Sequence, residues 1–423
     1  MLLLLLMETE IVEDKIFVMI ASYRDPELIP TIEDCIKKAR NPHLLTFGIC
    51  WQHSDQDEWD NLDEYKSNTN FTIMDVNWSD SQGVCWARHH IQNMWKGEKY
   101  CMQLDSHHRF TKNWDETLIN MMVLTGSNKP IITGYPAIYN PGQPIIKGQY
   151  PCKMNAFFTR DVISFTPSII DDSKNLSSPI QARFISGGFL FTYGIHTQEC
   201  MYDPEIYFIG EEISLSVKSF TNGYDLFHPH YTVLFHYYTR IGEKRHCDDF
   251  TDTNKTLKLV KKTFYEIDTI SKNRVRCLLK QSDDPNINLG KYILGNVRTL
   301  EEYELYAGIN FKKCLLHPDT ILKKNPPIND SSYEYKIIIN DYNFTIDVPK
   351  TDMTNLKFIS VMVDADDDYG GIYRKDLTEY VSTLDIFIQS RVKPHKLIFW
   401  SYSKTDEWVD KQEFIISTPL ENA

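Results

Sequence analysis

Asp105 and His107 stand two residues apart, directly after the apolar segment KYCMQLD at 99–105. In an extended segment, residues two apart point to the same face, so this carboxylate and this imidazole could bind one divalent cation. Oxygen together with a single imidazole suits Mn²⁺, or Mg²⁺, and leaves coordination positions for substrate phosphates. The structural alternative is that Asp105 caps a following helix and His107 is a solvated side chain.

The elements that must position this pair follow an alternating pattern. Apolar segments and helical patterns alternate along the first part of the chain: strands are expected at 16–22, 44–52, 71–77 and 99–105, and helices near 31–40 and over 84–95. This alternation predicts an α/β domain with a mostly parallel sheet covered on both faces. Ligands of such sheets bind at the carboxyl ends of strands, which is where Asp105 lies.

The middle of the chain continues the pattern with one interruption. We expect a helix over 112–125, a strand at 130–136, and then an irregular stretch to about residue 180 that is long for a connection. Regular segments return at 184–194, 211–223 and 224–240, and a helical region extends to roughly residue 310.

A boundary is predicted between Pro318 and Asn329, where two prolines are adjacent. The predicted organisation is a tail at 1–14, a main domain at 15–317 with a helical C-terminal part, and a small α/β or β-rich domain at 330–423 with one helix. Asp364 and Asp366 follow an apolar strand in that last domain, as in a metal motif. Too little chain surrounds them for a second nucleotide-binding domain, so we interpret them as a solvated loop or an incidental cation site.

Composition excludes some partners. The 423 residues carry a formal net charge of -13, which argues against a protein that mainly grips nucleic acid or an anionic membrane. The opening MLLLLLMETEI has no basic residue before its leucines and is too short for a membrane span, so we expect a cytoplasmic protein. Nine cysteines without a CxxC pair are expected to be reduced.

Five segments together resemble a known family. They are IFVMIASYRDPEL (16–28), GVCWARHHIQNMWKGEKYCMQLDSHHRF (83–110), FISGGFLFTYG (184–194), IYFIGEEISLSVKSFTNGYDLFHP (206–229) and HYYTR (236–240). The chain from about 15 to 310 resembles the GT-A (Rossmann-like) glycosyltransferases, in particular the cytoplasmic polypeptide N-acetylglucosaminyltransferases that modify hydroxyproline. It is also similar to the polypeptide N-acetylgalactosaminyltransferases, which share a D-S-H metal motif.

The resemblance implies a metal site. Asp105 and His107 would hold Mn²⁺ against the diphosphate of a UDP-sugar, and a histidine further along the chain would complete the site. His236 is the predicted third ligand, with His230 as its competitor; either could instead be a rim histidine. A metal at this point neutralises the diphosphate leaving group.

The resemblance also implies nucleotide contacts. Ser22, Tyr23 and Arg24 lie where this fold receives the uridine and ribose, although Tyr23 could simply pack and Arg24 could pair with Asp25 on the surface. Arg88 would approach the nucleotide, or else form a helix-surface salt bridge.

Further candidates lie after residue 180. Gly187 and Gly188 would let the backbone pass close to a sugar, or else form a tight bend. Of Glu211 and Glu212, only one is expected to reach the acceptor or the donor sugar, since adjacent helical residues point in different directions. The other is a charge at a helix N-terminus. Tyr238 and Arg240 could bind the diphosphate from a closing loop.

The resemblance implies a metal-dependent, retaining transfer of a sugar, GlcNAc from UDP-GlcNAc, to a hydroxyl of a protein acceptor such as hydroxyproline, serine or threonine. Glu211, Glu212 and Asp105 are the candidate catalytic residues. The alternatives are a transferase for another UDP-sugar or a glycan acceptor, a hydrolase of a sugar nucleotide or phosphate ester, and an idle binding module of the same fold.

Overall fold

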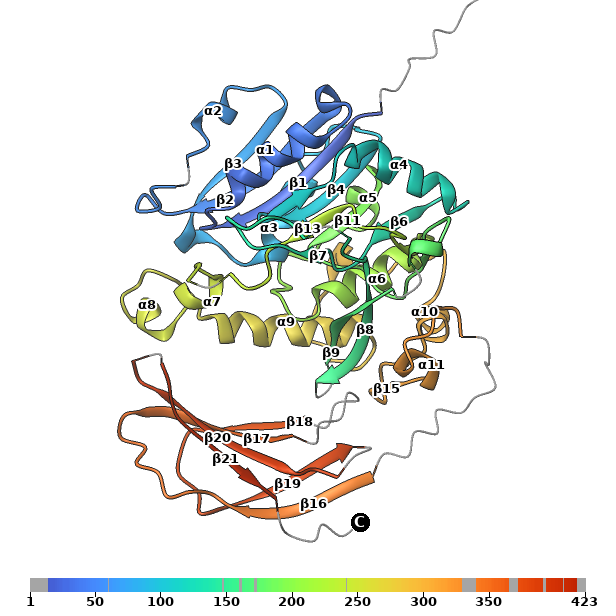
Figure 1. Cartoon of the computed structure of the whole chain (residues 1–423). Helices are drawn as coiled ribbons and strands as arrows, with labels where there is room; N and C mark the ends of the chain where they lie inside the picture. The colour runs from blue at the N-terminus through green and yellow to red at the C-terminus, as the bar shows by residue number, and fades with distance from the viewer. Residues whose placement is uncertain are drawn as a thin grey trace, which may run out of the picture.

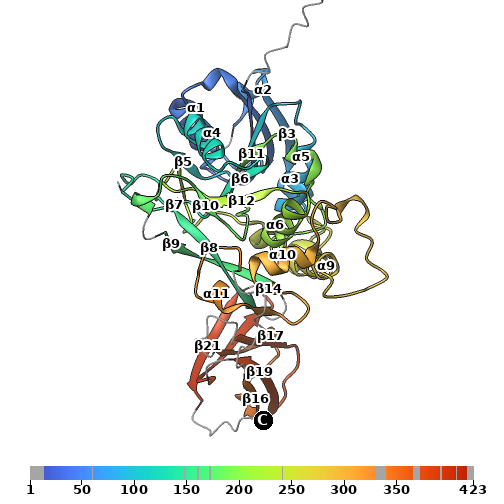
Figure 2. The same cartoon turned by 90° about the vertical axis from the view of Figure 1, so that its right-hand side faces the viewer.

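A computed structural model describes most of the chain. The described residues are 14–59, 61–146, 148–159, 162–170, 173–240, 242–328, 340–364, 372–390, 393–405 and 407–416. Figures 1 and 2 show two views of it, with the α/β part at one end and the C-terminal strands at the other.

The α/β part is built around a sheet of eight strands in the described residues. Their spatial order is β10 (Ile180–Gln181), β12 (Asp225–His228), β6 (Pro130–Thr133), β11 (Phe189–Tyr193), β4 (Tyr100–Asp105), β1 (Ile16–Tyr23), β2 (Leu45–His53) and β3 (Phe71–Asn77). Strands β3, β2, β1 and β4 are parallel, as predicted, and β11 runs antiparallel to both β4 and β6. The predicted α/β class is confirmed.

Alternating residues of β1 bury themselves on opposite faces of the sheet. Val18 and Ile20 join a core cluster with α1 (Leu28–Lys38) and α4 (Trp114–Leu124). Phe17 and Met19 join another with α3 (Val84–Gln92) and α6 (Glu211–Thr221). A strand that is buried on both faces reads as a continuous apolar run, which is why IFVMIAS was recognisable in the sequence.

A small second sheet lies beside the end of β4. Its order is β5 (His108–Phe110), β13 (Leu234–His236) and β7 (Ala137–Ile138). The chain leaves β4 at Asp105, bends at residues 106 and 107, and enters β5 at His108. The assumption that 105–107 stays extended is therefore wrong, because the chain changes sheets there.

The predicted irregular stretch before residue 180 contains a hairpin. Strand β8 (Cys152–Thr159) pairs antiparallel with β9 (Val162–Ile169). Met154, Ala156 and Phe158 are buried, and the period of two between them was the overlooked strand signal. The predicted helical region is present as α9 (Phe264–Leu278) and α10 (Leu300–Ala307). Shorter elements are α2 (Asp63–Lys66), α5 (His196–Glu199), α7 (His246–Asp249), α8 (Asp252–Thr256), α11 (Pro318–Ile321), β14 (Ile309–Asn310) and β15 (Leu315–Leu316).

The C-terminal part consists of two sheets. One pairs β16 (Asn340–Asp347) with β19 (Thr383–Ser390); the other has the order β18 (Ile372–Leu377), β17 (Leu356–Asp364), β20 (Lys396–Ser403) and β21 (Trp408–Ile415). They enclose a core of their own that includes Val361, Ile386 and Phe399. This part is β-rich, as predicted, but the helix expected here does not occur in its described residues.

The C-terminal sheets meet the α/β part near α8 and α9 (Figure 1). Lys357 Nζ lies 2.8 Å from the Asp252 carboxylate, and the rings of Tyr265 and Phe358 are in edge contact with centroids 6.5 Å apart. Of the two aspartates interpreted above as a solvated loop or an incidental cation site, Asp364 ends β17, and Asp366 lies outside the described residues. Throughout the described ranges, each helix is too short or too polar to cross a lipid bilayer.

Candidate metal and substrate site

Asp105 lies at the carboxyl end of β4 and has side-chain partners from two other elements. Its carboxylate accepts a hydrogen bond from Arg88 Nη2 of α3 at 2.6 Å, and His236 Nε2 of β13 lies 3.2 Å away. The side chain is 29% exposed, so one side remains open to a ligand. The sequence prediction that a site forms at this strand end agrees with this convergence.

Asp105, His108 and His236 form a compact group in which the three potential ligand atoms lie within 4.8 Å of one another. His108 and His236 are direct cross-strand partners in β5 and β13, which brings their rings to the same side. His108 is fully buried, and neither of its ring nitrogens has a hydrogen-bond partner among the described residues. A buried imidazole without a partner, a second imidazole and a carboxylate fit a divalent cation such as Mn²⁺.

The predicted ligand His107 lies beside this group rather than in it. Its Nδ1 is 2.6 Å from the carboxylate of Asp25, and its ring is 4.6 Å from that of His236. A carboxylate on one ring nitrogen is the usual support for a metal-binding histidine, because it leaves the other nitrogen free. His107 therefore stays a predicted ligand, with His108 as a second imidazole in reach. His230 does not join the group.

The titration behaviour of the group suits cation binding. Burial alone would raise the pKa of Asp105, but the hydrogen bond with His236 and the charge of Arg88 hold it well below its usual value. Burial lowers the pKa of His108 and of His236. An ionised carboxylate between neutral imidazoles is the protonation state that a metal ion requires.

Arg88 connects Asp105 to the start of α6. Its Nη1 donates to Glu211 while its Nη2 donates to Asp105. Arg88 is 3% exposed and Glu211 4% exposed, so this is a buried ion pair and not the surface salt bridge that was the alternative reading. The positive charge of Arg88 therefore offsets the negative charges of both Asp105 and Glu211.

Gly187 and Gly188 are close to these acidic groups. A Cβ at Gly187 would lie 3.0 Å from Arg88 Nη1 and from Glu211 Oε1, and a Cβ at Gly188 would lie 2.7 Å from Asp105 Oδ2. The pair therefore permits a close approach of backbone to the acidic groups, and the predicted contact with a sugar stays a prediction.

Both glutamates of α6 lie close to Gly187, and the expectation that only one of them contacts a sugar stays a prediction. Glu212 Oε1 accepts from the backbone N–H of Gly187 at 3.0 Å, and Glu212 Oε2 accepts from Tyr135 Oη at 2.8 Å. The loop at 187 passes over the first turn of α6 and meets both side chains. Burial raises the pKa of Glu212 to about 7.

The residues at the end of β1 point to a different set of partners. Tyr23 Oη donates to Asp249 at 2.9 Å, and Arg24 pairs with Asp57 at 2.8 Å and with Asp249 at 3.0 Å. The alternative pairing of Arg24 with Asp25 does not occur. Ser22 is fully buried, and its hydroxyl has no partner among the described residues.

Tyr238 and Arg240 follow β13 at the other side of the site. The ring of Tyr238 lies 4.2 Å from that of His236, and its hydroxyl donates to the carbonyl of Pro136. Arg240 Nη2 lies 3.4 Å from Asp25 Oδ2. A guanidinium and a phenol are thus close to the imidazoles, and their predicted contact with a diphosphate stays a prediction.

Three site residues were missed in the sequence: Asp25, His108 and Tyr135. Asp25 is 1% exposed and binds His107, Ser106 and Arg240. A carboxylate between an arginine and a proline directly after β1 was a usable signal, since strand ends gather site residues. His108 was hidden by the assumption of an extended 105–107, and Tyr135 had no signal beyond following β6.

Comparison with known proteins assigns this arrangement to a family. The family model described as Glycosyltransferase (GlcNAc) matches residues 15–73 and 60–313 of the chain. The chain belongs to this glycosyltransferase family. The matched region of this glycosyltransferase contains all the site residues described above and agrees with the predicted GT-A resemblance. A comparison with curated proteins gives no match.

Solved structures provide more distant likenesses to this glycosyltransferase. GalNAc-T7 with UDP, GalNAc and Mn²⁺ is 16% identical, with a TM-score of 0.45, covering 69% of this chain and 54% of that chain. S. aureus TarS 1-349 in complex with UDP-GlcNAc is 13% identical, with a TM-score of 0.36, covering 62% of this chain and 72% of that chain. The chain spans about half the length of the GalNAc-T7 chain that it matches.

Proposed function

We propose that this glycosyltransferase uses a UDP-sugar, GlcNAc from UDP-GlcNAc, and transfers the sugar with retention to a hydroxyl of a protein acceptor such as hydroxyproline, serine or threonine. The observation that carries the proposal is the convergence of Asp105, His108 and His236 at the end of β4, next to the close backbone of Gly188. Family membership supports the transfer of a sugar.

The donor set of the site supports a metal ion, Mn²⁺ or Mg²⁺. Asp105 and His236 would hold it together with an imidazole from His107 or His108. When bound, such an ion neutralises charge on the diphosphate leaving group.

The residues of the chain then have distinct roles in the proposed reaction. Arg88 holds Asp105 and Glu211 in position, and Gly187 and Gly188 leave room for the sugar. Arg240 is a forked donor suited to the diphosphate.

We propose that the anomeric configuration is retained because the acceptor hydroxyl attacks the anomeric carbon on the same face from which UDP leaves. The bond from the acceptor oxygen to the anomeric carbon forms while the bond from that carbon to the diphosphate oxygen breaks, and a diphosphate oxygen accepts the acceptor's proton. This route needs no carboxylate nucleophile. Glu212, with its raised pKa, would instead contact a sugar hydroxyl through its carboxyl group.

The test is a panel of UDP- and GDP-sugars with purified protein and Mn²⁺, in which release of free nucleotide is measured with and without EDTA. We expect EDTA-sensitive UDP release from UDP-GlcNAc, and its loss in Asp105→Asn. Asp283→Asn, an exposed carboxylate outside the site, is the matched control and should retain full activity.

The same assay separates the alternatives. Equal UDP release with and without added acceptor peptides would favour a hydrolase. No release from any donor, without thermal stabilisation by any UDP-sugar, would favour an idle binding module. The proposed cytoplasmic location is supported by the nine cysteines, all of which are free thiols.

A further inference from the structure

Gln103 is a polar residue within the buried strand β4. It is 2% exposed and is paired in register with Met19 of β1 and Leu190 of β11. Burying an amide between such neighbours is unfavourable unless its polar atoms are hydrogen-bonded. The partners of this side chain therefore indicate what a glutamine contributes at this position.

The Nε2 atom of Gln103 donates two hydrogen bonds. One goes to the backbone carbonyl oxygen of Gly187 at 2.7 Å and the other to Tyr202 Oη at 2.8 Å. Because a carbonyl oxygen only accepts, the amide must turn its nitrogen and not its oxygen toward Gly187. The buried ring of Tyr202 lies 5.9 Å from the guanidinium of Arg88, which in turn binds Asp105. Gln103 thus joins the turn at Gly187 to the surroundings of the proposed metal site.

The turn that Gln103 holds consists of two consecutive glycines. Gly187 and Gly188 lead into β11, and a Cβ at Gly188 would lie 2.7 Å from Asp105 Oδ2. Glycine is the least restricted residue, so such a turn does not fix its own backbone orientation. Two side chains do so instead, because Glu212 accepts from the N–H of Gly187 and Gln103 donates to its carbonyl.

The bond from Gln103 orients the peptide that joins the two glycines. This peptide is planar and trans, so its carbonyl and its N–H point in opposite directions. With the carbonyl held by Gln103, the N–H of Gly188 points away from Gln103, and it donates to no residue that the structure describes. Gly187 is buried and Gly188 is partly exposed. The peptide is therefore held from its buried side, next to Asp105.

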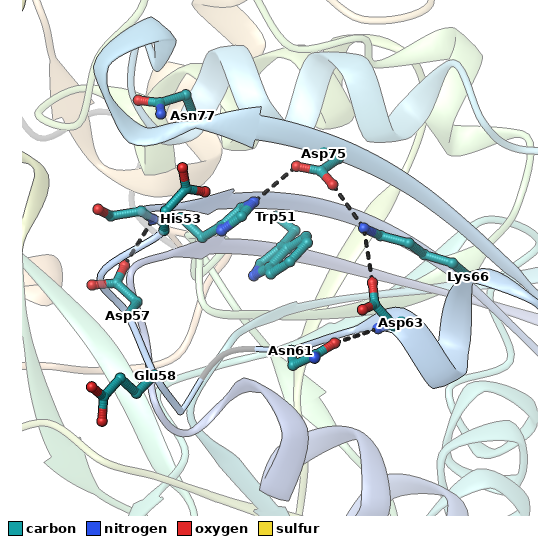
Figure 3. A pocket seen from close by; sticks show the side chains of 11 residues that line it. Trp51, His53, Asp57, Glu58, Asn61, Asp63, Lys66, Asp75 and Asn77 are labelled. Atoms are coloured by element: carbon teal, nitrogen blue, oxygen red, sulfur yellow. Dashed lines mark hydrogen bonds and ion pairs between the residues drawn. The ribbon is translucent and has the colours of Figure 1, made fainter.

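An acidic cavity of about 480 Å³ at the carboxyl ends of β2 and β3, lined in part by Trp51, shows a contrasting arrangement (Figure 3). Its charged side chains bind one another: Lys66 Nζ lies 2.8 Å from the carboxylate of Asp75 and 3.3 Å from that of Asp63. Such pairs are complete among themselves. Gln103 instead uses both of its amide hydrogens on the glycine turn and on a neighbour of Arg88.

We propose that Gln103 is a positioning residue of the transfer reaction, which sets the orientation of the Gly187–Gly188 turn by holding the carbonyl of Gly187. The inference rests on the proposed function, in which this turn leaves room for the sugar of the donor. Asp105 keeps its contacts with Arg88 and His236 whether or not Gln103 is present. Loss of Gln103 should therefore change the rate of sugar transfer and leave the binding of metal and UDP unchanged.

The first measurement observes the turn directly and needs no ligand. Among the 18 glycines, only Gly187–Gly188 and Gly370–Gly371 are adjacent pairs. Glycine labelled with ¹⁵N and with ¹³C at its carbonyl therefore gives two carbonyl–amide correlations, and Gly371→Ala removes one and so assigns the other. In Gln103→Met, which is similar in length but has no donor, we expect the carbonyl ¹³C signal of Gly187 to move upfield, because the carbonyl loses its hydrogen bond.

The second measurement separates positioning from stability. In Gln103→Met, kcat for UDP release from UDP-GlcNAc should fall about tenfold or more, since a small misplacement at the reacting centre is costly in rate. Calorimetric affinities for Mn²⁺ and for UDP should equal those of the wild type. Gln103→Asn, whose amide is one methylene too short to reach the carbonyl, should behave in the same way and decides the question if Gln103→Met does not fold.

Thr192→Val is the matched control. Thr192 is buried in β11, and its hydroxyl donates to the carbonyl of Pro130 at 2.7 Å, the same length as the bond from Gln103 to Gly187. The variant loses a buried hydrogen bond to a carbonyl without touching the turn, so it should leave both the Gly187 signal and kcat unchanged.

Three outcomes would overturn the inference: an unchanged Gly187 carbonyl signal in the Gln103 variants, an unchanged kcat, or an equal loss of kcat in Thr192→Val. The absence of UDP release from the wild type with every donor would instead contradict the proposed function. In that case the carbonyl signal would still decide whether Gln103 holds the turn, so the two proposals fail separately.

Discussion

Arg88 Nη2 of α3 lies 2.6 Å from Oδ1 of Asp105, which ends the next element, β4. The same guanidinium also donates to Glu211. One buried cation therefore balances two carboxylates, one of them the central residue of the proposed metal site. This arrangement makes Arg88 a positioning residue whose loss leaves an uncompensated charge in the interior.

Arg88→Met should destabilise the protein by about 3–5 kcal/mol, because Glu211 would remain buried without its partner. The double variant Arg88→Met with Glu211→Gln should recover most of that loss, since it removes the unpaired charge. Urea denaturation followed by far-UV circular dichroism measures both. A single variant within about 0.5 kcal/mol of the wild type would show that the pair contributes no such compensation.

Gly188→Ala should abolish sugar transfer while the protein stays folded. The added Cβ would lie 2.7 Å from Asp105 Oδ2, so the carboxylate must move away from His236. Neither Gly126→Ala nor Gly134→Ala is a suitable control. Gly126 has a positive φ, and a Cβ at Gly134 would lie 2.9 Å from the carbonyl oxygen of Cys152. Ser177→Ala, at an exposed position, serves instead. UDP release and Mn²⁺-dependent thermal stabilisation should both be lost in Gly188→Ala and retained in the control.

His108→Ala should weaken Mn²⁺ binding at least tenfold, because its two ring nitrogens are buried, without partners, and close to Asp105 and His236. His107→Ala is the matched comparison in the neighbouring position. Calorimetric titration with Mn²⁺ in the absence of nucleotide gives both affinities. Full affinity in His108→Ala together with its loss in His107→Ala would assign the ligand to His107, as the Asp-x-His motif predicts.

The fold was largely predictable because its strands are buried on both faces. Runs such as IFVMIAS and KYCMQLD identified β1 and β4, and the strand-end rule located Asp105. The hairpin of β8 and β9 was missed because its strands, CKMNAFFT and VISFTPSI, mix polar with apolar residues and so give a weaker signal than a continuous apolar run.

The partners within the site could not be read from the sequence. The Asp25–His107 contact joins residues 82 positions apart, and the Arg88–Glu211 pair spans 123 positions. No local pattern encodes such pairings, since they depend on how α3, α6 and the loop at Gly187 pack against the sheet. The acidic cavity at Trp51 was missed for the same reason, because its lining comes from β2, β3 and the segment between them.

The stability of the protein should depend on Glu212 in a defined pH window. Its pKa is raised by burial to about 7, against 4.5 for an ordinary glutamate, so the folded state binds a proton that the unfolded state has released between these values. In that window the free energy of unfolding contributed by this group falls as pH rises, by about 1.4 kcal/mol per pH unit, and is constant above about pH 7. Below about pH 4.5 both states are protonated and the contribution is again constant.

Glu212→Gln should remove this component. Urea denaturation of the wild type, Glu212→Gln and the exposed control Glu379→Gln between pH 5 and 7.5 measures it, and the stability of Glu212→Gln relative to wild type should rise with pH across the window. The control should follow the wild type throughout. Parallel curves for wild type and Glu212→Gln would mean that Glu212 is ionised in the folded protein at pH 5, and that its hydrogen bonds from Gly187 and Tyr135 outweigh the effect of burial.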